Sequence, residues 1–171
     1  SAEQRVRMLQ VAADGQRQLC RGQGAELCWA RHPQPLRSTE VLDIFRRKTA
    51  PAFEVALRLG ALHAGVDRHQ EVSDVLGRYS EALGVAYQIR DDLSDLGFAG
   101  ETNDIAGLRP SLLLAVAHEK ARGTQKDLLA AIDELLARQD KSALAKLRSL
   151  ATGEASTDPR TDFIKSLSAA Y

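Results

Sequence analysis

The residues whose types and spacing could do chemistry are three aspartates, Asp91, Asp92 and Asp95, in the run YQIRDDLSD. On a helix, residues four apart share a face, so Asp91 and Asp95 would place two negative charges roughly 5–6 Å apart. Such a pair destabilises a helix unless a cation lies between the two carboxylates. Carboxylate oxygens suit Mg²⁺, which binds through one or two carboxylates together with substrate phosphates. The pattern therefore predicts a magnesium site for a diphosphate ligand.

The elements that must position these aspartates are helices. Strand signals are almost absent, and apolar residues recur at three- and four-residue spacing nearly throughout the chain. The run His32-Pro33-Gln34-Pro35 ends the first helix, and Ser38 or Thr39 can cap the next one. We expect an all-α bundle with helices at about 3–30, 38–45, 49–64 or 51–64, 69–96, 110–121, 124–138 and 141–151, the last capped by Asp140.

The aspartate cluster falls at the C-terminal end of the predicted helix 69–96. The apolar spacing of this helix predicts an inward face made of Val72, Leu76, Tyr79, Leu83, Ala86, Ile89 and Leu93. Carboxylates are disfavoured near a helix C-terminus, because the helix dipole is negative there. Stability alone would therefore not favour three aspartates in that last turn, which supports a functional role. The loop that follows carries three glycines and leads to Arg109 and Pro110. We therefore expect the loop and the cluster to be adjacent.

Composition limits the function classes. Lys and Arg number 23, as do Asp and Glu, so the net charge is zero and favours neither nucleic acid nor an anionic membrane. The uncharged runs are shorter than the 20 or so apolar residues of a transmembrane segment. Cys20 and Cys28, about 12 Å apart along one helix, are predicted to be free thiols. Free thiols suit a reducing compartment, so we expect a cytoplasmic protein.

The domain organisation is expected to be simple. We treat Ser1-Ala2 as an expression remnant and expect residues 3–171 to belong to one helical domain. A stretch rich in small and polar residues, 153–159, reads as a linker before a terminal helix.

Four landmarks together resemble a known family. They are Gly22-Gln23 followed by Glu26; Lys48-Thr49-Ala50; Gln88 three residues before the DDxxD; and Asp104-Ile105 before Arg109-x-Ser111. In this order they resemble the C-terminal half of a trans-isoprenyl diphosphate synthase, of the polyprenyl synthetase family. The resemblance implies the all-α isoprenoid synthase-type helical bundle, here incomplete. It also implies a Mg²⁺-dependent prenyltransferase that condenses isopentenyl diphosphate with an allylic prenyl diphosphate.

The resemblance also implies a role for each matching residue. Asp91, Asp92 and Asp95 match the family's second aspartate-rich motif, which holds Mg²⁺ against the allylic diphosphate. Lys48 and Gln88 are the predicted catalytic residues, and Lys48 grips that diphosphate. Substrate-binding roles fall to Lys48, Thr49, Gln23, Gln88 and Arg109, the last at a position where the family commonly has lysine.

Three departures from the family pattern stand out. The stretch 98–101 offers no lysine where the family has one, and Glu26 stands where the family has aspartate. The first aspartate-rich motif and the residues that bind isopentenyl diphosphate belong to an N-terminal half that this chain does not contain. The chain is either part of a longer synthase or a natural short homologue. We expect it to form a homo-oligomer, or to associate with the missing half or a full-length subunit.

Other interpretations of the same residues stay open. A DDxxD on a surface helix is usually a solvated acidic face, and the run Arg46-Arg47-Lys48 is more often solvent-facing than ligand-binding. Trp29 is best read as a packing residue or a dimer contact. The main functional alternative is a non-catalytic diphosphate-binding or regulatory subunit that partners a full-length synthase. A terpene cyclase is less favoured, because cyclases usually lack the Lys-Thr landmark.

Overall fold

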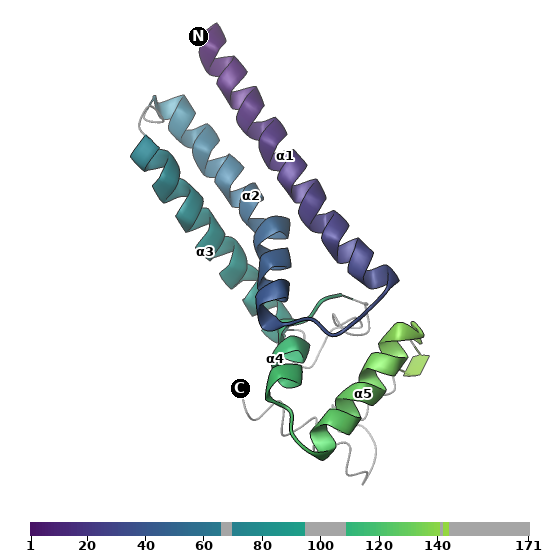
Figure 1. The fold of residues 1–171 in the computed structure, drawn as a ribbon. Coiled ribbons are helices and arrows are strands. Elements are labelled where there is room, and N and C mark those ends of the chain that lie inside the picture. The colour runs from purple at the N-terminus through teal and green to yellow at the C-terminus, as the bar shows by residue number, and fades with distance from the viewer. Residues whose placement is uncertain (66–69, 95–108, 141, 144–171) are drawn as a thin grey trace. The chain divides into compact units, whose positions relative to one another are not determined.

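The structure is a computed structural model that describes residues 1–65, 70–94, 109–140 and 142–143 (Figure 1). These residues form five helices: α1 (Ala2–Arg31), α2 (Ser38–Ala64), α3 (Gln70–Ser94), α4 (Leu112–Lys120) and α5 (Thr124–Ala137). The described residues contain no strand, so the all-α prediction is confirmed. Within the same residues, no helix is both long and apolar enough to cross a membrane. Most of the predicted helix 141–151, and the linker 153–159 with the segment after it, lie outside the described residues.

Most helix ends fall where the sequence predicts them. α1 ends at Arg31, just before the Pro-containing run, and α2 ends at Ala64, before Gly65 with φ of 75°. A positive φ of this kind suits glycine, which has no Cβ. The predicted cap at Asp140 is confirmed, because its Oδ1 accepts a hydrogen bond from the Ala143 N–H at 2.9 Å.

One predicted boundary is wrong: the two expected helices 38–45 and 49–64 are a single helix, α2, with Pro51 in its interior. A proline inside a helix has no N–H for the carbonyl four residues earlier, here that of Arg47, and its ring disturbs the same turn. Figure 1 shows α2 changing direction along its length. The helix therefore bends at this defect and does not break.

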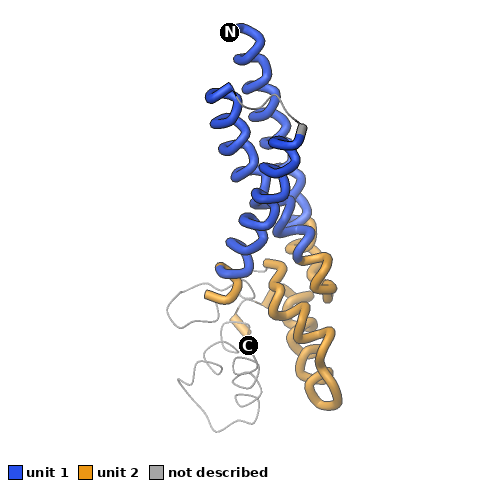
Figure 2. Tube along the Cα trace, turned by 90° about the vertical axis from the view of Figure 1, so that its left-hand side faces the viewer, with its two compact units in different colours: residues 1–27, 42–90 blue, residues 28–41, 91–171 orange. Residues whose placement is uncertain are grey.

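The chain divides into two compact units (Figure 2). The first unit comprises residues 1–27 and 42–90, and the second comprises residues 28–41 and 91–171. Helices α1, α2 and α3 each contribute most of their length to the first unit, and α4 and α5 belong to the second.

In the first unit, three long helices run alongside one another in alternating directions (Figure 1). Small residues set their spacing. A Cβ added to Gly84 of α3 would lie 2.7 Å from the Ala50 Cα of α2, and one added to Gly15 of α1 would lie 2.1 Å from Val55 Cγ2. Contacts this close leave no room for a side chain. The helices therefore approach through glycine.

The buried face of α3 differs from the predicted one. We expected Val72, Leu76, Tyr79, Leu83, Ala86, Ile89 and Leu93 to point inward, but Tyr79, Leu83, Ala86 and Leu93 are exposed. The buried positions of α3 within the first unit are Ser80 and Gly84, and Gly84 permits the close approach to Ala50 of α2. The apolar periodicity predicted the helix correctly but predicted the wrong buried face. Small residues, and not the large apolar ones, occupy the buried positions of α3.

In the second unit, α4 and α5 pack around the buried side chains of Leu129 and Leu136, with Ala117 and Ala121 beside Leu129. Ser111 is the N-cap of α4, and its hydroxyl accepts a hydrogen bond from the Leu114 N–H at 3.3 Å. A serine in this position satisfies one of the amides that a helix start leaves without a partner.

The start of α2 is held by glutamates. Glu40 accepts a hydrogen bond from the Arg37 N–H at 2.8 Å, and Glu119 accepts one from the Ser38 N–H at 2.7 Å. We expected a hydroxyl of Ser38 or Thr39 to cap this end. The Glu40 contact is instead one half of a capping box, in which an acid in the first turn bonds back to the residue before the helix.

Candidate functional site

Lys48, the predicted diphosphate-binding residue, lies in the first unit at a contact between α1 and α2. Its Nζ donates to Glu26 Oε2 at 2.5 Å, and Gln23 Nε2 donates to Glu26 Oε1 at 3.2 Å. Glu26 is buried, with 9% of its side chain exposed, whereas the Lys48 side chain keeps 22% exposed. The structure therefore brings two of the predicted site residues, Gln23 and Lys48, onto one buried carboxylate.

The two helices meet at Lys48 because of Gly22. A Cβ on Gly22 would lie 2.4 Å from the Arg47 carbonyl carbon and 2.5 Å from the Lys48 backbone nitrogen. Pro51 cannot donate to the Arg47 carbonyl, so the bend in α2 and the close approach of α1 fall at the same turn. Arg46 and Arg47 are exposed and pair with Asp43, as expected for the solvent-facing part of this basic run.

Thr49 and Gln88 are both half-buried. Gln88 follows Gly84 by four residues, so it lies on the same side of α3 as the glycine that approaches Ala50 of α2. Next to it, the exposed Tyr87 ring lies 6.3 Å from the Phe53 ring and 5.3 Å from the Arg90 guanidinium carbon. The described contacts of this region are therefore aromatic and cationic.

The aspartates at the end of α3 lie in the second unit and have different surroundings. Asp91 is exposed, but Asp92 is only 3% exposed. Asp92 Oδ2 accepts hydrogen bonds from the backbone N–H groups of Leu112 at 2.7 Å and Leu113 at 3.2 Å, at the start of α4. The sequence argument that stability does not favour aspartates here is therefore wrong for Asp92, because the N-terminus of α4 stabilises its charge.

Asp95 lies outside the described residues, as do Asp104, Ile105 and the stretch 98–101. Within the part of the chain that the structure describes, no three His, Cys, Asp or Glu side chains are grouped to hold a metal. Arg109 is exposed and stands two residues before the α4 N-cap, Ser111. Cys20 and Cys28 are exposed free thiols, as predicted.

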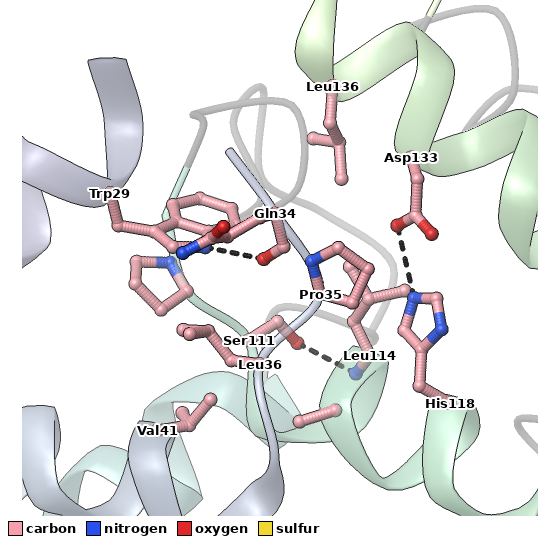
Figure 3. Close-up of a pocket in the computed structure, with 12 residues that line it drawn as sticks. Trp29, Gln34, Pro35, Leu36, Val41, Ser111, Leu114, His118, Asp133 and Leu136 are labelled. Carbon is pink, nitrogen blue, oxygen red and sulfur yellow. Dashed lines mark hydrogen bonds and ion pairs between the residues drawn. The ribbon is translucent and has the colours of Figure 1, made fainter. Parts of the chain in front are cut away.

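A small pocket in the second unit is lined by the end of α1, the segment after it, and residues of α4 and α5 (Figure 3). Trp29 Nε1 donates to the Gln34 carbonyl at 2.8 Å, and the His118 and Asp133 side chains meet at 3.1 Å. Burial raises the pKa of the Asp133 carboxyl, and the His118 ring opposes part of that rise. The described residues that line this pocket include no predicted site residue, and Trp29 has the predicted packing role.

Comparison with known proteins decides the family. Residues 1–151 match the polyprenyl synthetase family model. The chain belongs to the polyprenyl synthetase family. It is 33% identical over 150 residues to the farnesyl diphosphate synthase of Escherichia coli (strain K12), a match that covers 80% of this chain and 48% of that protein. It is 30% identical over 129 residues to the geranylfarnesyl diphosphate synthase of Aeropyrum pernix, covering 71% of this chain and 39% of that protein.

The fold agrees with this family. The structure of geranylgeranyl pyrophosphate synthetase from Pyrococcus horikoshii Ot3 matches 99% of this chain and 51% of that chain, with a TM-score of 0.64 at 22% identity. The helical fold of isoprenoid synthases is thereby confirmed. This polyprenyl synthetase chain spans about half the length of the curated relatives it matches.

Sequence reasoning noticed Glu26 as a departure from the family pattern but gave it no role. The signal was present, because Gln23 and Glu26 are three residues apart and therefore neighbours on one helix face, next to Gly22. The sequence pattern does not show that α1 approaches α2 at Lys48. That approach is a tertiary contact, which single-sequence patterns do not contain.

Proposed function

We propose that this polyprenyl synthetase chain supplies part of a Mg²⁺-dependent prenyltransferase site that condenses isopentenyl diphosphate with an allylic prenyl diphosphate. The family match over residues 1–151 carries the proposal. The relatives are named as farnesyl and geranylfarnesyl diphosphate synthases, so the reaction class is chain elongation of prenyl diphosphates. We propose the matching segment to be the C-terminal half of such a synthase.

Asp91, Asp92 and Asp95 would hold Mg²⁺. The donor set fits, because carboxylate oxygens are the ligands that this cation prefers, and Asp91 is exposed at the end of α3. Asp92 is the anchored member of the set, since two backbone amides of α4 already fix its Oδ2. When bound, Mg²⁺ would neutralise charge on a diphosphate.

The remaining residues bind and orient the substrate. Lys48 would contact the allylic diphosphate with its ammonium group, and Arg109 would bind phosphate with its planar, forked guanidinium. Cationic groups at these positions stabilise the negative charge that builds up as diphosphate leaves the allylic carbon. Gln88, Thr49 and Gln23 would line the pocket. The half-buried state of Thr49 and Gln88 supports this role.

A second candidate function, a non-catalytic subunit that binds diphosphate and partners a full-length synthase, has its own supporting observation. Val75, Tyr79, Leu83 and Tyr87 recur every four residues along α3 and are exposed. We call this set the α3 stripe. Contiguous exposed apolar surface marks interaction sites, so the stripe favours a partner or a second copy of the chain.

A thermal-shift experiment with Mg²⁺ and pyrophosphate tests the proposed site. A ligand present at 100 times its dissociation constant stabilises a fold by about 2.7 kcal/mol, so the two components together should raise the melting temperature. Asp91→Asn should lose most of that shift. Glu71→Gln, which removes an exposed carboxylate from the first turn of the same helix, should keep it.

An equal shift in the unmodified chain and in Asp91→Asn would overturn the metal assignment. Product analysis then separates the two functions, with isopentenyl diphosphate and allylic diphosphates of several lengths added to this chain together with an N-terminal half that carries the first aspartate-rich motif. An elongated product supports the prenyltransferase, whereas ligand binding with no product supports the non-catalytic subunit.

A further inference from the structure

Glu26 is the one acidic side chain on α1 that the described structure buries, and it lies four residues after Gly22, where the α1 backbone closely approaches that of α2. Its two oxygens have different neighbours: Oε1 accepts from Gln23 of the same helix, and Oε2 accepts from Lys48 of α2. A buried carboxylate that is paired and hydrogen-bonded is fixed in place, because leaving it unpaired costs several kcal/mol.

The contact between Glu26 and Lys48 constrains a side chain that is otherwise mobile. A lysine side chain has four rotatable bonds, so an unpaired ammonium samples many positions. The contact fixes the ammonium group at its far end, while 22% of the side chain stays exposed. An ammonium has three N–H donors, so one can bind Glu26 while others bind an oxygen of a diphosphate.

We propose that Glu26, held by Gln23, is a positioning residue for Lys48. The inference rests on the proposed role of Lys48 as a diphosphate-binding residue. Glu26 acts through Lys48 and has no contact of its own with the substrate. It holds the ammonium at a fixed place before the diphosphate arrives, so less side-chain freedom is lost on binding.

The length of the glutamate is part of the proposal. Glutamate is longer than aspartate by one methylene group, and the close approach at Gly22 sets the distance that this side chain must span. Glu26→Asp keeps the charge but shortens the reach, whereas Glu26→Gln keeps the reach but removes the charge. The two variants therefore separate distance from charge at one position.

Calorimetric titration of the chain with pyrophosphate in Mg²⁺ measures the consequence. Lys48→Ala should weaken binding on the order of tenfold, as expected for the loss of one charged hydrogen bond. Glu26→Gln should weaken it by a similar factor, and Glu26→Asp by less. The double variant Glu26→Gln/Lys48→Ala should bind no more weakly than Lys48→Ala, because residues in one network are not additive.

The matched control is Arg47→Ala, which removes the exposed cation next to Lys48 and should leave the affinity within about twofold. If Lys48→Ala weakens binding but Glu26→Gln leaves it unchanged or tightens it, the positioning role is wrong while the proposed function stands. If Lys48→Ala has no effect, the proposed role of Lys48 is wrong.

A spectroscopic readout keeps the positioning role testable without any ligand. In ¹⁵N-lysine spectra, an ammonium held by a buried carboxylate exchanges its protons slowly, so Lys48 should give a protected signal. That signal should be lost in Glu26→Gln and partly restored in Glu26→Asp, with circular dichroism confirming that both variants stay helical. A Lys48 signal that is equally protected in Glu26→Gln would overturn the inference.

Discussion

The described parts of the two units differ in how many large apolar side chains they expose. Among the described residues, the first unit exposes a series of large apolar side chains on α1 and α3: Val6, Leu9, Leu27, Val75, Tyr79, Leu83 and Tyr87. The second unit exposes Leu93 but buries Trp29, Val41, Leu129 and Leu136. The first unit also buries Phe45 and Leu62, but it exposes more large apolar side chains than the described part of the second unit does. The exposed apolar side chains of the first unit are therefore the expected contact surface for a partner.

Carboxylates differ between the units as well. In the second unit, Asp92 near the end of α3 accepts from the amides at the start of α4, and Glu119 near the end of α4 accepts from the Ser38 N–H at the start of α2. In the first unit, Glu26 instead holds the side-chain ammonium of Lys48. Acids near a helix C-terminus are disfavoured by their own helix dipole, but a neighbouring helix start offers amide donors and the positive end of its own dipole.

This difference changes how an aspartate cluster should be read. Asp91 and Asp92 are adjacent in the sequence, yet one is exposed and the other is buried against backbone amides. Asp91 is open to solvent, whereas Asp92 uses its Oδ2 to connect α3 to the start of α4. A cluster of carboxylates can therefore combine a binding role and a structural role within two residues.

The largest expected effect tests this division directly. Asp92→Ala should lower the free energy of unfolding by about 2–3 kcal/mol, because it leaves two amides at a helix start without their buried acceptor. Asp91→Ala should change it by less than about 0.5 kcal/mol, as surface substitutions usually do. Urea denaturation of both variants measures the difference.

Asp92→Asn is the matched intermediate, since it keeps an acceptor oxygen but removes the charge. It should fall between Asp91→Ala and Asp92→Ala. Equal losses of stability in Asp91→Ala and Asp92→Ala would contradict the comparison, because the two aspartates would then share one environment.

Much of the fold could be predicted from the sequence. Apolar spacing of three and four residues located the five helices of the described residues, although α2 was expected as two, and the run that contains Pro33 marked the end of α1. The interior of α2 was not predictable in this way. Pro51 reads as a helix start, but α2 continues across it, and α1 closely approaches α2 at Gly22 in the turn before Pro51.

The candidate site was predictable only as residue types. The sequence singled out Lys48, Gln23 and the aspartates, but not that Glu26 joins the first two or that Asp92 faces α4. Both arrangements depend on contacts between helices far apart in the chain. The face of α3 was misjudged for a related reason, because Ser80 and Gly84 are the buried positions where larger apolar residues were expected.

A smaller effect is expected for self-association through the α3 stripe. Leu83→Ser should raise the dissociation constant of self-association about tenfold, since burying a leucine side chain contributes roughly 1.5–3 kcal/mol and part of it is buried already. Leu9→Ser is the control, because Leu9 is 70% exposed on α1 and lies outside the stripe. Sedimentation equilibrium measures both.

A chain that stays monomeric at every concentration would remove the support for a second copy on the stripe. The exposed apolar side chains of the first unit would then have to contact a different partner. Equal weakening by Leu83→Ser and Leu9→Ser would show that association is non-specific.

The smallest expected effect concerns pH. The pKa of the Glu119 carboxyl lies below its ordinary value because the Ser38 N–H donates to it. A carboxyl with a lowered folded-state pKa contributes stability above its unfolded pKa, and this stability is lost as the pH falls through the folded pKa. Glu119→Gln lacks this contribution, so its melting temperature should be slightly below that of the unmodified chain at pH 7, and the difference should close as the solution is acidified.

Glu134→Gln is the control, because it removes a similar charge from an exposed pair with Arg138. Its difference in melting temperature from the unmodified chain should change less over the same pH range. A Glu119→Gln gap that is independent of pH would mean that the charge of Glu119 does not stabilise the start of α2, and the parallel between Glu119 and Asp92 would fail.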